Sequence, residues 1–273
     1  MKAFIHTLLL LALCVVSRSY AMLPVPLDLA TQATVRATRA WPAMPPQPLP
    51  KGLRPCCAFG YNLHAALWGI SVPLYQLDNV VSAEHLGQHQ YNDKMLAGLE
   101  NLTGLSRENN GILYTTRGGF IDTAHVRDTA DMTVYIFSQL LPRLGQAFTL
   151  DLESELAQRR LAFTAFTPPT DPAERYPLAA WLAAHLAYQV AEWHEIAQWY
   201  GFESVPGFSE GISAFSPEDL YSNLLGARIA VSLILDGQTV SQGVYNAAMS
   251  TGLTQALMHL GAQSPEMTRF HFD

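Results

Sequence analysis

Residues 177–200 read PLAAWLAAHLAYQVAEWHEIAQWY, and this stretch decides the fold class. At about 100° per residue, its larger apolar side chains fall on one side of a helix and its alanines on the other. A helix that is apolar on all sides is buried among other elements. The proline at the start and Gly201 after the end are typical helix boundaries, so we expect a long buried helix here.

Further helical patterns lie on both sides of this stretch and begin after capping residues or end near glycine. They cover residues 82–102, 122–144, 150–163, 216–235 and 241–260. Residues 112–116, ILYTT, are typical of a short strand that ends before two glycines. The sequence therefore predicts a mainly α-helical, single-domain bundle with a minor β element.

The first 21 residues have the pattern of a secretory signal peptide. Lys2 precedes an apolar run, and Ser19-Tyr20-Ala21 is a small-x-small cleavage pattern. The run is shorter than the roughly 20 apolar residues of a membrane span. Cys14 follows a leucine instead of a small residue, which favours plain secretion over lipidation. We expect cleavage after residue 21, a periplasmic or secreted protein, and no transmembrane span after cleavage.

Proline usage divides the remaining chain in two. Residues 22–55 hold eight of the seventeen prolines and are predicted to form an N-terminal arm that lies over a helical domain of residues 56–273. Cys56 and Cys57 follow this arm directly. Their Cα atoms lie about 3.8 Å apart across a trans peptide, below the usual disulfide range. Two buried thiols, a strained vicinal disulfide and a bond to another chain all stay open.

The charge of the chain argues against nucleic acid as a partner. Loss of Lys2 and Arg18 with the signal peptide changes the formal net charge from -7 to -9, because residues 1–21 contain no acid. Only Lys51 and Lys94 remain as lysines. The sequence offers no basic stretch that could neutralise a row of phosphates. The substrate is expected to be a small molecule or an envelope component that the sequence does not identify.

Four ionisable residues interrupt the apolar stretch 177–200, namely His185, Glu192, His194 and Glu195. A carboxylate buried alone costs several kcal/mol or becomes protonated, so these groups need partners. The predicted helix 122–144 offers His125 and Asp128 at an i,i+3 spacing that faces the core. Imidazole and carboxylate groups that converge from two helices are the usual way in which bundles build metal sites.

We therefore interpret His125, Asp128, His194 and Glu192 as candidate ligands of a divalent metal ion, zinc or iron. Glu195 is the candidate catalytic base or a further ligand. A structural interpretation stands beside this one, in which His125 and Asp128 form a hydrogen-bonded core pair. In the same interpretation, Asp122 and the Ser216-to-Asp219 segment only cap their helices.

Two other patterns are weaker candidates. His194-Glu195 begins like a zinc-protease helix, but Gln198 stands where that motif needs its second histidine. His85 and His89 have a metal-binding i,i+4 spacing, although Gly87 lies between them. The turn 117–119, Arg-Gly-Gly, has a composition that binds anions, and a tight turn that needs glycine explains it as well.

Longer motifs carry a family resemblance. They are RPCCAFG at 54–60, RGGFIDTAHVRD at 117–128, WHEIAQWYG at 193–201 and SPEDLYSNLLG at 216–226. With these motifs the chain resembles a family of exported bacterial proteins that is catalogued only as a domain of unknown function. The resemblance covers roughly residues 52–260 and implies one contiguous domain in an exported bacterial protein, without implying an activity.

These observations lead to three hypotheses about function. The first is a metal-dependent hydrolase with a His/Asp/Glu site between helices, in which the metal lowers the pKa of a bound water. The second is a non-enzymatic envelope or binding protein, in which the buried polar network only specifies packing. The third is a module that binds a small anion at residues 117–119.

Overall fold

A computed structural model describes the chain over residues 44–51, 53, 54, 63–67, 70–92, 106–203, 211 and 214–272. The predicted signal peptide, Cys56 and Cys57 lie outside these residues. The described part is mainly α-helical with small β elements, as predicted. None of its helices combines the length and the apolar character needed to cross a membrane.

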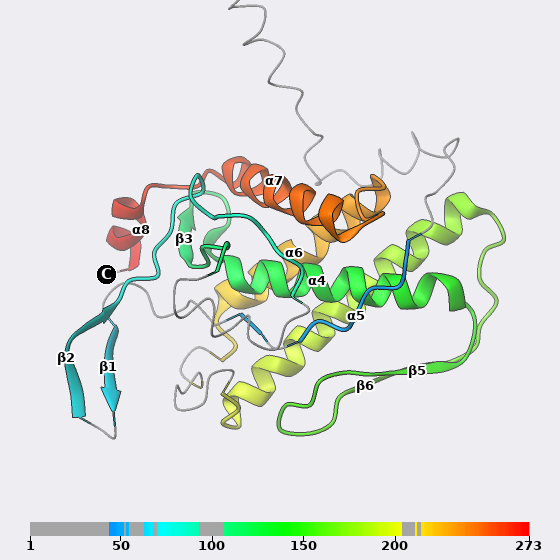
Figure 1. The fold of residues 1–273 in the computed structure, drawn as a ribbon, viewed down its shortest axis with the longest axis horizontal. Helices are drawn as coiled ribbons and strands as arrows, with labels where there is room; N and C mark the ends of the chain where they lie inside the picture. The colour runs from blue at the N-terminus through cyan, green and yellow to red at the C-terminus, as the bar shows by residue number, and fades with distance from the viewer. Residues whose placement is uncertain are drawn as a thin grey trace, which may run out of the picture.

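Three long helices form the centre of the fold. They are α4 (Thr123–Leu140), α5 (Pro172–Trp199) and α6 (Pro217–Leu235), and each packs against the other two. Figure 1 shows α5 crossing α4 at an angle, with α6 beside both. The buried alanines of α5 at positions 179, 180, 183, 184 and 187 allow this close packing, as the alanine side of the sequence predicted.

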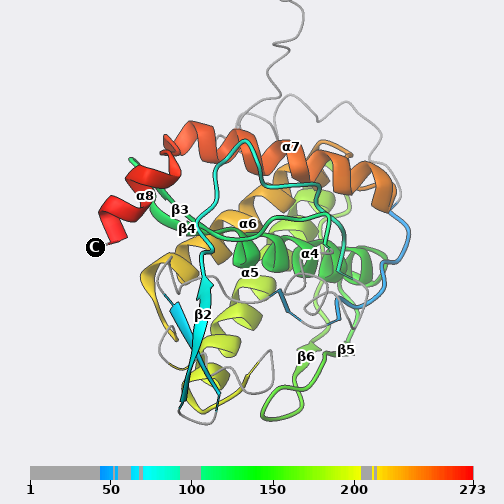
Figure 2. The same cartoon turned by 60° about the vertical axis from the view of Figure 1, so that its left-hand side comes forward.

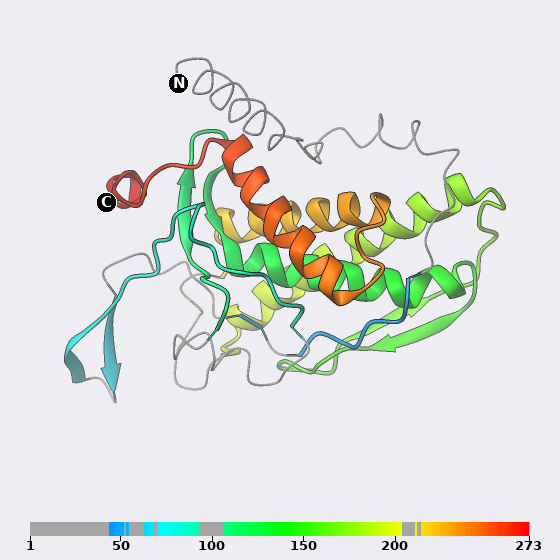
Figure 3. The same ribbon diagram turned by 45° about the horizontal axis from the view of Figure 1, so that its top comes forward.

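Two more helices lie outside this centre. Helix α7 (Gln242–Leu260) packs against α6 and crosses in front of α4 and α6 in Figure 3. It ends at Gly261, whose φ of 77° is a left-handed conformation that glycine adopts without strain. Helix α8 (Pro265–Phe272) packs against the strand β3 near the described C-terminal end.

The β structure consists of three antiparallel hairpins in the described chain. The first pairs β1 (Leu63–Leu67) with β2 (Ile70–Leu77); it extends away from the helices in Figure 1 and is drawn in front of α5 in the turned view of Figure 2. The second pairs β3 (Ile112–Thr115) with β4 (Gly119–Asp122), which leads directly into α4. The third pairs β5 (Phe148–Asp151) with β6 (Arg160–Phe163). A short 3₁₀ helix, η1 (Leu141–Arg143), follows α4.

The hairpin β5–β6 replaces the helix that the sequence predicted over 150–163, and that prediction was wrong. The apolar side chains of both strands alternate with period two, which suits a hairpin lying on the helices. The charged residues between the strands suggested a helix because Glu155 and Arg159 have i,i+4 spacing. They do form an ion pair of 2.6 Å, but in the loop that joins the strands.

Two other predicted helices differ from the structure. Residues 82–92, the described part of the segment 82–102, contain no helix. Helix α5 starts at Pro172 after the N-cap Asp171, so Pro177 lies inside it and is not its first residue. Pro177 is the sixth residue of the helix and lies beyond the four N–H groups that lack an intrahelical partner, so it removes the hydrogen bond that an N–H at this position would donate to the Ala173 carbonyl.

The described part of the N-terminal arm, residues 44–51, 53 and 54, runs along α4 (Figures 1 and 3). The backbone N–H of Gln47 donates to Ser138 Oγ at 3.0 Å, and that of Lys51 donates to the Asn92 carbonyl at 2.8 Å. At its end, Arg54 is buried. The arm is therefore held on the helical centre at several points.

Candidate functional site

Asp122 stands at the junction of β4 and α4. It is the N-cap of α4, and its Oδ1 accepts hydrogen bonds from the backbone N–H groups of Ala124 at 2.8 Å and His125 at 3.4 Å. The N-terminal end of a helix carries partial positive charge, which stabilises a carboxylate placed there. Asp122 is fully buried, so its charge faces the protein interior.

His125 follows one helical turn later and lies between two carboxylates from other helices. Its Nε2 is 3.5 Å from Oδ1 of Asp219, and its Nδ1 is 4.0 Å from Oε1 of Glu195. One ligand atom each from Asp122, His125 and Asp219 lie within 4.8 Å of one another. We call these three residues, together with Glu195, the His125 cluster.

Asp219 reaches the His125 cluster from the first turn of α6. The side chain is fully buried. The pKa of Asp219 is raised to about 7, mainly by burial; His125 opposes the rise, and charge repulsion from Asp122 and Glu195 adds to it. Three carboxyl groups around a single imidazole therefore repel one another when ionised, and a bound cation would relieve this repulsion.

Glu195 comes from α5 and is also fully buried. Its Oε2 accepts a hydrogen bond of 2.8 Å from the backbone N–H of Phe215. Within the described chain, its Oε1 has no hydrogen-bond partner. Phe215 has a φ of 62°, a left-handed conformation that is uncommon for a residue with a side chain. Such backbone conformations concentrate at functional sites, and here it directs an N–H group at a site carboxylate.

A cavity of about 220 Å³ opens in front of His125. His194 of α5 lies on its wall, with its ring centroid 6.4 Å from that of His125. The Nδ1 of His194 is 3.2 Å from Oε1 of Glu155, which also pairs with Arg159. Carboxylate contact of this kind fixes the orientation of an imidazole. The cavity therefore has two oriented histidines on its wall.

The rest of the cavity wall is largely apolar. It includes Pro50, Leu53, Met132, Ala187, Val190, Ala191 and Phe202. Some of the charged residues on the cavity wall form ion pairs with each other, such as Arg54 with Asp128 and Arg159 with Glu155. Within the described part of the chain, Oε2 of Glu155 is buried and accepts no hydrogen bond. This lining suits a small ligand that is mostly apolar and carries a hydrogen-bond donor.

The structure brings together some of the residues that the sequence singled out. His125 and Glu195 are neighbours, and His194 lies across the cavity from His125. Glu192 lies about one helical turn before Glu195 on α5. Its side chain is exposed on the outer face of the helix, whereas that of Glu195 is buried. Asp128 lies on the cavity wall, but its carboxylate contacts Arg54 instead of His125.

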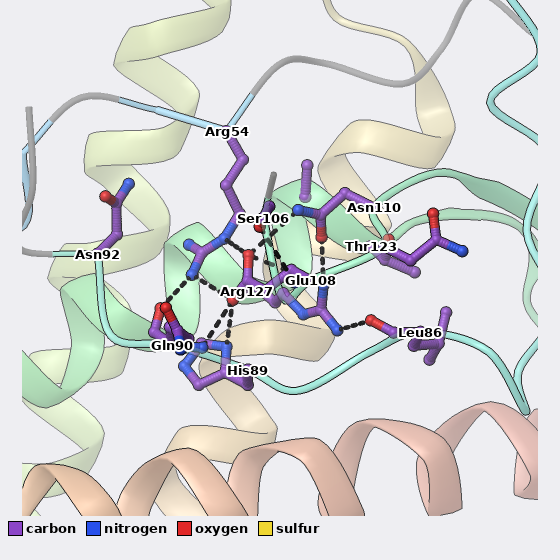
Figure 4. A network of polar contacts seen from close by, with 12 residues as sticks. Arg54, Leu86, His89, Gln90, Asn92, Ser106, Glu108, Asn110, Thr123 and Arg127 are labelled. Carbon is purple, nitrogen blue, oxygen red and sulfur yellow. Dashed lines mark hydrogen bonds and ion pairs between the residues drawn. The ribbon is translucent and has the colours of Figure 1, made fainter. Parts of the chain in front are cut away.

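Arg54 is the centre of a buried ionic network, and Figure 4 shows its contact with Glu108 and the neighbouring His89. Its Nη1 donates to Asp128 at 2.5 Å and to Asp131 at 3.1 Å, and its Nε donates to Glu108 at 2.6 Å. His89 lies in the same network, with Nε2 3.0 Å from Asp131. We call these five residues the Arg54 network.

The Arg54 network predicts a pH dependence of stability. Burial alone would raise the pKa of Glu108, but Arg54 and His89 lower it well below its ordinary value of 4.5. A carboxyl with a lowered folded-state pKa stabilises the protein above that ordinary value and loses this contribution as the pH falls. We expect Glu108→Gln to lose much less of its free energy of unfolding than the parent when the pH is lowered below about 4.5, because the contribution of the Glu108 carboxylate is lost in that range.

Urea denaturation at several pH values measures this difference. Glu84→Gln, a change at an exposed glutamate, is the matched control and is expected to follow the parent at every pH. Parallel pH profiles for Glu108→Gln and the parent would contradict the assignment.

The weaker candidates from the sequence do not form sites of their own. His85 is exposed and contacts Ser82, whereas His89 is buried in the Arg54 network. In the turn between β3 and β4, the Arg117 N–H donates to the Leu260 carbonyl, and the Gly118 N–H donates to Thr115 Oγ1. These two amides therefore already have acceptors within the protein.

Two residues of the His125 cluster, Asp122 and Asp219, were interpreted from the sequence only as capping residues. Asp122 does cap α4, but both side chains also face His125. One signal was available, because Asp122 and His125 are three residues apart at the start of a helix and share a face. Nothing in the sequence indicated that the first turn of α4 and the first turn of α6 lie next to each other.

Comparison with family models gives a match over residues 44–273 to a family described as "Protein of unknown function (DUF4056)". The chain belongs to this family. The match covers the described arm, the Arg54 network and the His125 cluster. Comparisons with curated proteins and with solved structures give no significant match. The family assignment carries no activity, and the function has to be argued from the site.

Proposed function

We propose that this protein is a metal-dependent hydrolase that holds a divalent metal ion between Asp122, His125 and Asp219. The observation that carries the proposal is the approach of one ligand atom from each residue to within 4.8 Å of the others in a buried site. Imidazole and carboxylate ligands suit zinc and iron, and the ligand set does not separate the two. A metal held by three protein ligands keeps a position for water.

Glu195 supports this proposal as a positioning residue. Metal-bound histidines commonly donate their second ring N–H to a carboxylate, which fixes the tautomer. Oε1 of Glu195 faces Nδ1 of His125, while Nε2 of His125 faces Asp219. In this arrangement, a proton on Nδ1 leaves the Nε2 lone pair for the metal. Glu195 then orients His125, a role that differs from the catalytic base suggested by the sequence.

The cavity supports the hydrolytic part of the proposal. His125 is the member of the cluster that lines the cavity, so a ligand in the cavity would approach the metal from this side. His194, oriented by Glu155, lies on the same wall and has a nitrogen that can exchange protons with a substrate. A metal ion held by Asp122, His125 and Asp219 would supply the nucleophile, by lowering the pKa of a bound water toward about 7.

Metal binding is tested by titrating zinc and iron(II) into metal-free protein by calorimetry. We expect one ion per chain, no measurable binding by His125→Ala, and affinity lowered by about 10–100-fold in Glu195→Gln because only the orientation of His125 is lost. His259→Ala removes an exposed histidine and is the matched control, with affinity unchanged.

Substoichiometric metal in folded parent protein, or unchanged affinity in folded His125→Ala, would overturn the proposal. The alternative function would then stand, a non-enzymatic envelope or binding protein. If the metal binds, hydrolysis of chromogenic esters and phosphoesters by the parent and by Asp219→Asn separates a catalytic site from a structural one. A structural metal predicts loss of stability in Asp219→Asn with no hydrolysis by either protein.

The proposal also places the protein outside the cytosol, in the periplasm or in secreted form. The support is the sequence pattern of residues 1–21. Mass spectrometry of protein recovered from the cell envelope and medium tests this part, with an N-terminus at Met22 as the expected result.

A further inference from the structure

The outer face of helix α5 carries a row of exposed side chains that the proposed function does not use. Four of them are large and apolar: Leu178, Trp181, Ile196 and Trp199, the last 64 % exposed. Two polar residues, His185 and Glu192, lie between the apolar ones and are also exposed. At about 100° per residue, all six fall within an arc of about 60°. We call these six residues the α5 stripe.

An apolar row of this length on a surface helix usually marks an interaction site. The stripe covers 22 residues from Leu178 to Trp199, or about 32 Å of helix. Trp193 and Tyr200 are exposed beside it and widen the apolar surface. Tryptophan and tyrosine are enriched at protein interfaces, because they bury large areas at little conformational cost.

The order of residues along the stripe is self-complementary. In an antiparallel pair of α5 helices whose two-fold axis passes between Tyr188 and Gln189, each residue faces a matching residue of the second copy. The opposed residues are Leu178 and Trp199, Trp181 and Ile196, and His185 and Glu192. The register that places apolar residues against apolar ones is thus the same register that places each histidine against a glutamate.

We propose that the α5 stripe is the interface of a homodimer in which two copies pair through antiparallel α5 helices. A two-fold interface uses the same surface patch on both subunits and needs this kind of self-complementarity. The two His185–Glu192 contacts fix the register, and the apolar contacts on both sides of them provide most of the affinity.

The charge of the helix argues against a lipid surface as the occupant. Helices that bind membrane surfaces carry lysine and arginine on the polar side of their apolar face. Helix α5 has Arg175 as its single basic residue apart from histidine, against three glutamates. The formal net charge of the chain is -7, which also disfavours binding to anionic lipids.

Sedimentation equilibrium of the purified protein tests the proposal. We expect a concentration-dependent dimer that becomes a monomer in Trp181→Glu and in Trp199→Glu. Met258→Glu changes an exposed apolar residue of α7 and is the matched control, with the dimer unchanged. Thermal unfolding followed by circular dichroism establishes that each variant is folded, as expected for changes at exposed positions.

A charge exchange tests the register. His185→Glu places two glutamates against each other at two symmetric positions and is expected to raise the dimer dissociation constant at least about tenfold. The double variant His185→Glu with Glu192→Lys restores opposite charges and is expected to return the constant toward the parent value. A surface that bound through apolar contacts alone would show no such recovery.

Three results would overturn the proposal. They are a monomer at every concentration reached, a dimer that persists in Trp181→Glu and Trp199→Glu, and a charge exchange without recovery. Binding of the monomer to vesicles of phosphatidylglycerol with no self-association would assign the stripe to a membrane instead. None of these results depends on metal, so the test is independent of the proposed function.

Discussion

Replacement of Arg54 by alanine is expected to lower the free energy of unfolding by about 3–5 kcal/mol. The guanidinium contacts the carboxylates of Glu108, Asp128 and Asp131, and the side chain is almost fully buried. Without it, three acidic groups stay close together in the interior, and Arg127 contacts Glu108 alone among them, at 3.8 Å. Removing one partner of a buried ion pair costs more than the pair contributes, because the remaining charge has lost its solvation.

Urea denaturation at pH 7 measures this loss. Lys51→Ala, a change at an exposed cation of the same arm, is the control and is expected to change the free energy of unfolding by less than about 0.5 kcal/mol. Arg54→Lys should also be destabilised, because one ammonium group cannot reproduce the separate donors that reach the three carboxylates. A stability of Arg54→Ala within about 1 kcal/mol of the parent would show that the network does not hold the arm.

Replacement of Gly226 by alanine is expected to destabilise the protein by about 3 kcal/mol or more. Gly226 lies where α6 approaches α4 most closely, and an added Cβ would stand 2.1 Å from the carbonyl oxygen of Val126. A backbone atom cannot move aside as the end of a flexible side chain can. The two helices must therefore separate, and with them His125 on α4 and Asp219 on α6.

The same substitution at Gly243 is the matched control. Gly243 is also helical, but a Cβ there meets no atom within 4 Å, so alanine is expected to stabilise α7 by up to about 1 kcal/mol. Thermal and urea denaturation measure both changes. Metal titration of Gly226→Ala then measures how far the site depends on helix spacing. Equal stability of Gly226→Ala and the parent would contradict the close contact between α4 and α6.

The fold class was predictable because it rests on patterns within single segments. The apolar stretch 177–200 correctly predicted a central helix, but the expectation that this helix is buried on all sides was wrong, because one face of it exposes Trp181, Ile196 and Trp199. The segment 150–163 failed because its charges and its apolar residues indicated different periods. The decisive fact, the pairing of Asp151 with Arg160 across a loop, is a contact between separate strands. Helical spacing and hairpin spacing cannot be told apart from so few residues.

The candidate site was only partly predictable for a related reason. His125, His194 and Glu195 stood out because each is an ionisable residue in an apolar segment. Asp122 and Asp219 occupy the first turns of helices, where aspartate is common for structural reasons alone. Glu192 is three residues from Glu195 and looked equivalent, but rotation along α5 places it on the exposed face. Only the packing of three helices decides which carboxylates face His125.

The position of Arg54 in the chain has a consequence for the cooperativity of unfolding. Its carboxylate partners lie 54, 74 and 77 residues further along the sequence, on α4 and on the segment before β3. If the arm detached alone, these buried carboxylates would lose the guanidinium that faces them. We therefore expect the arm and the helical centre to open together, as one cooperative unit in hydrogen exchange.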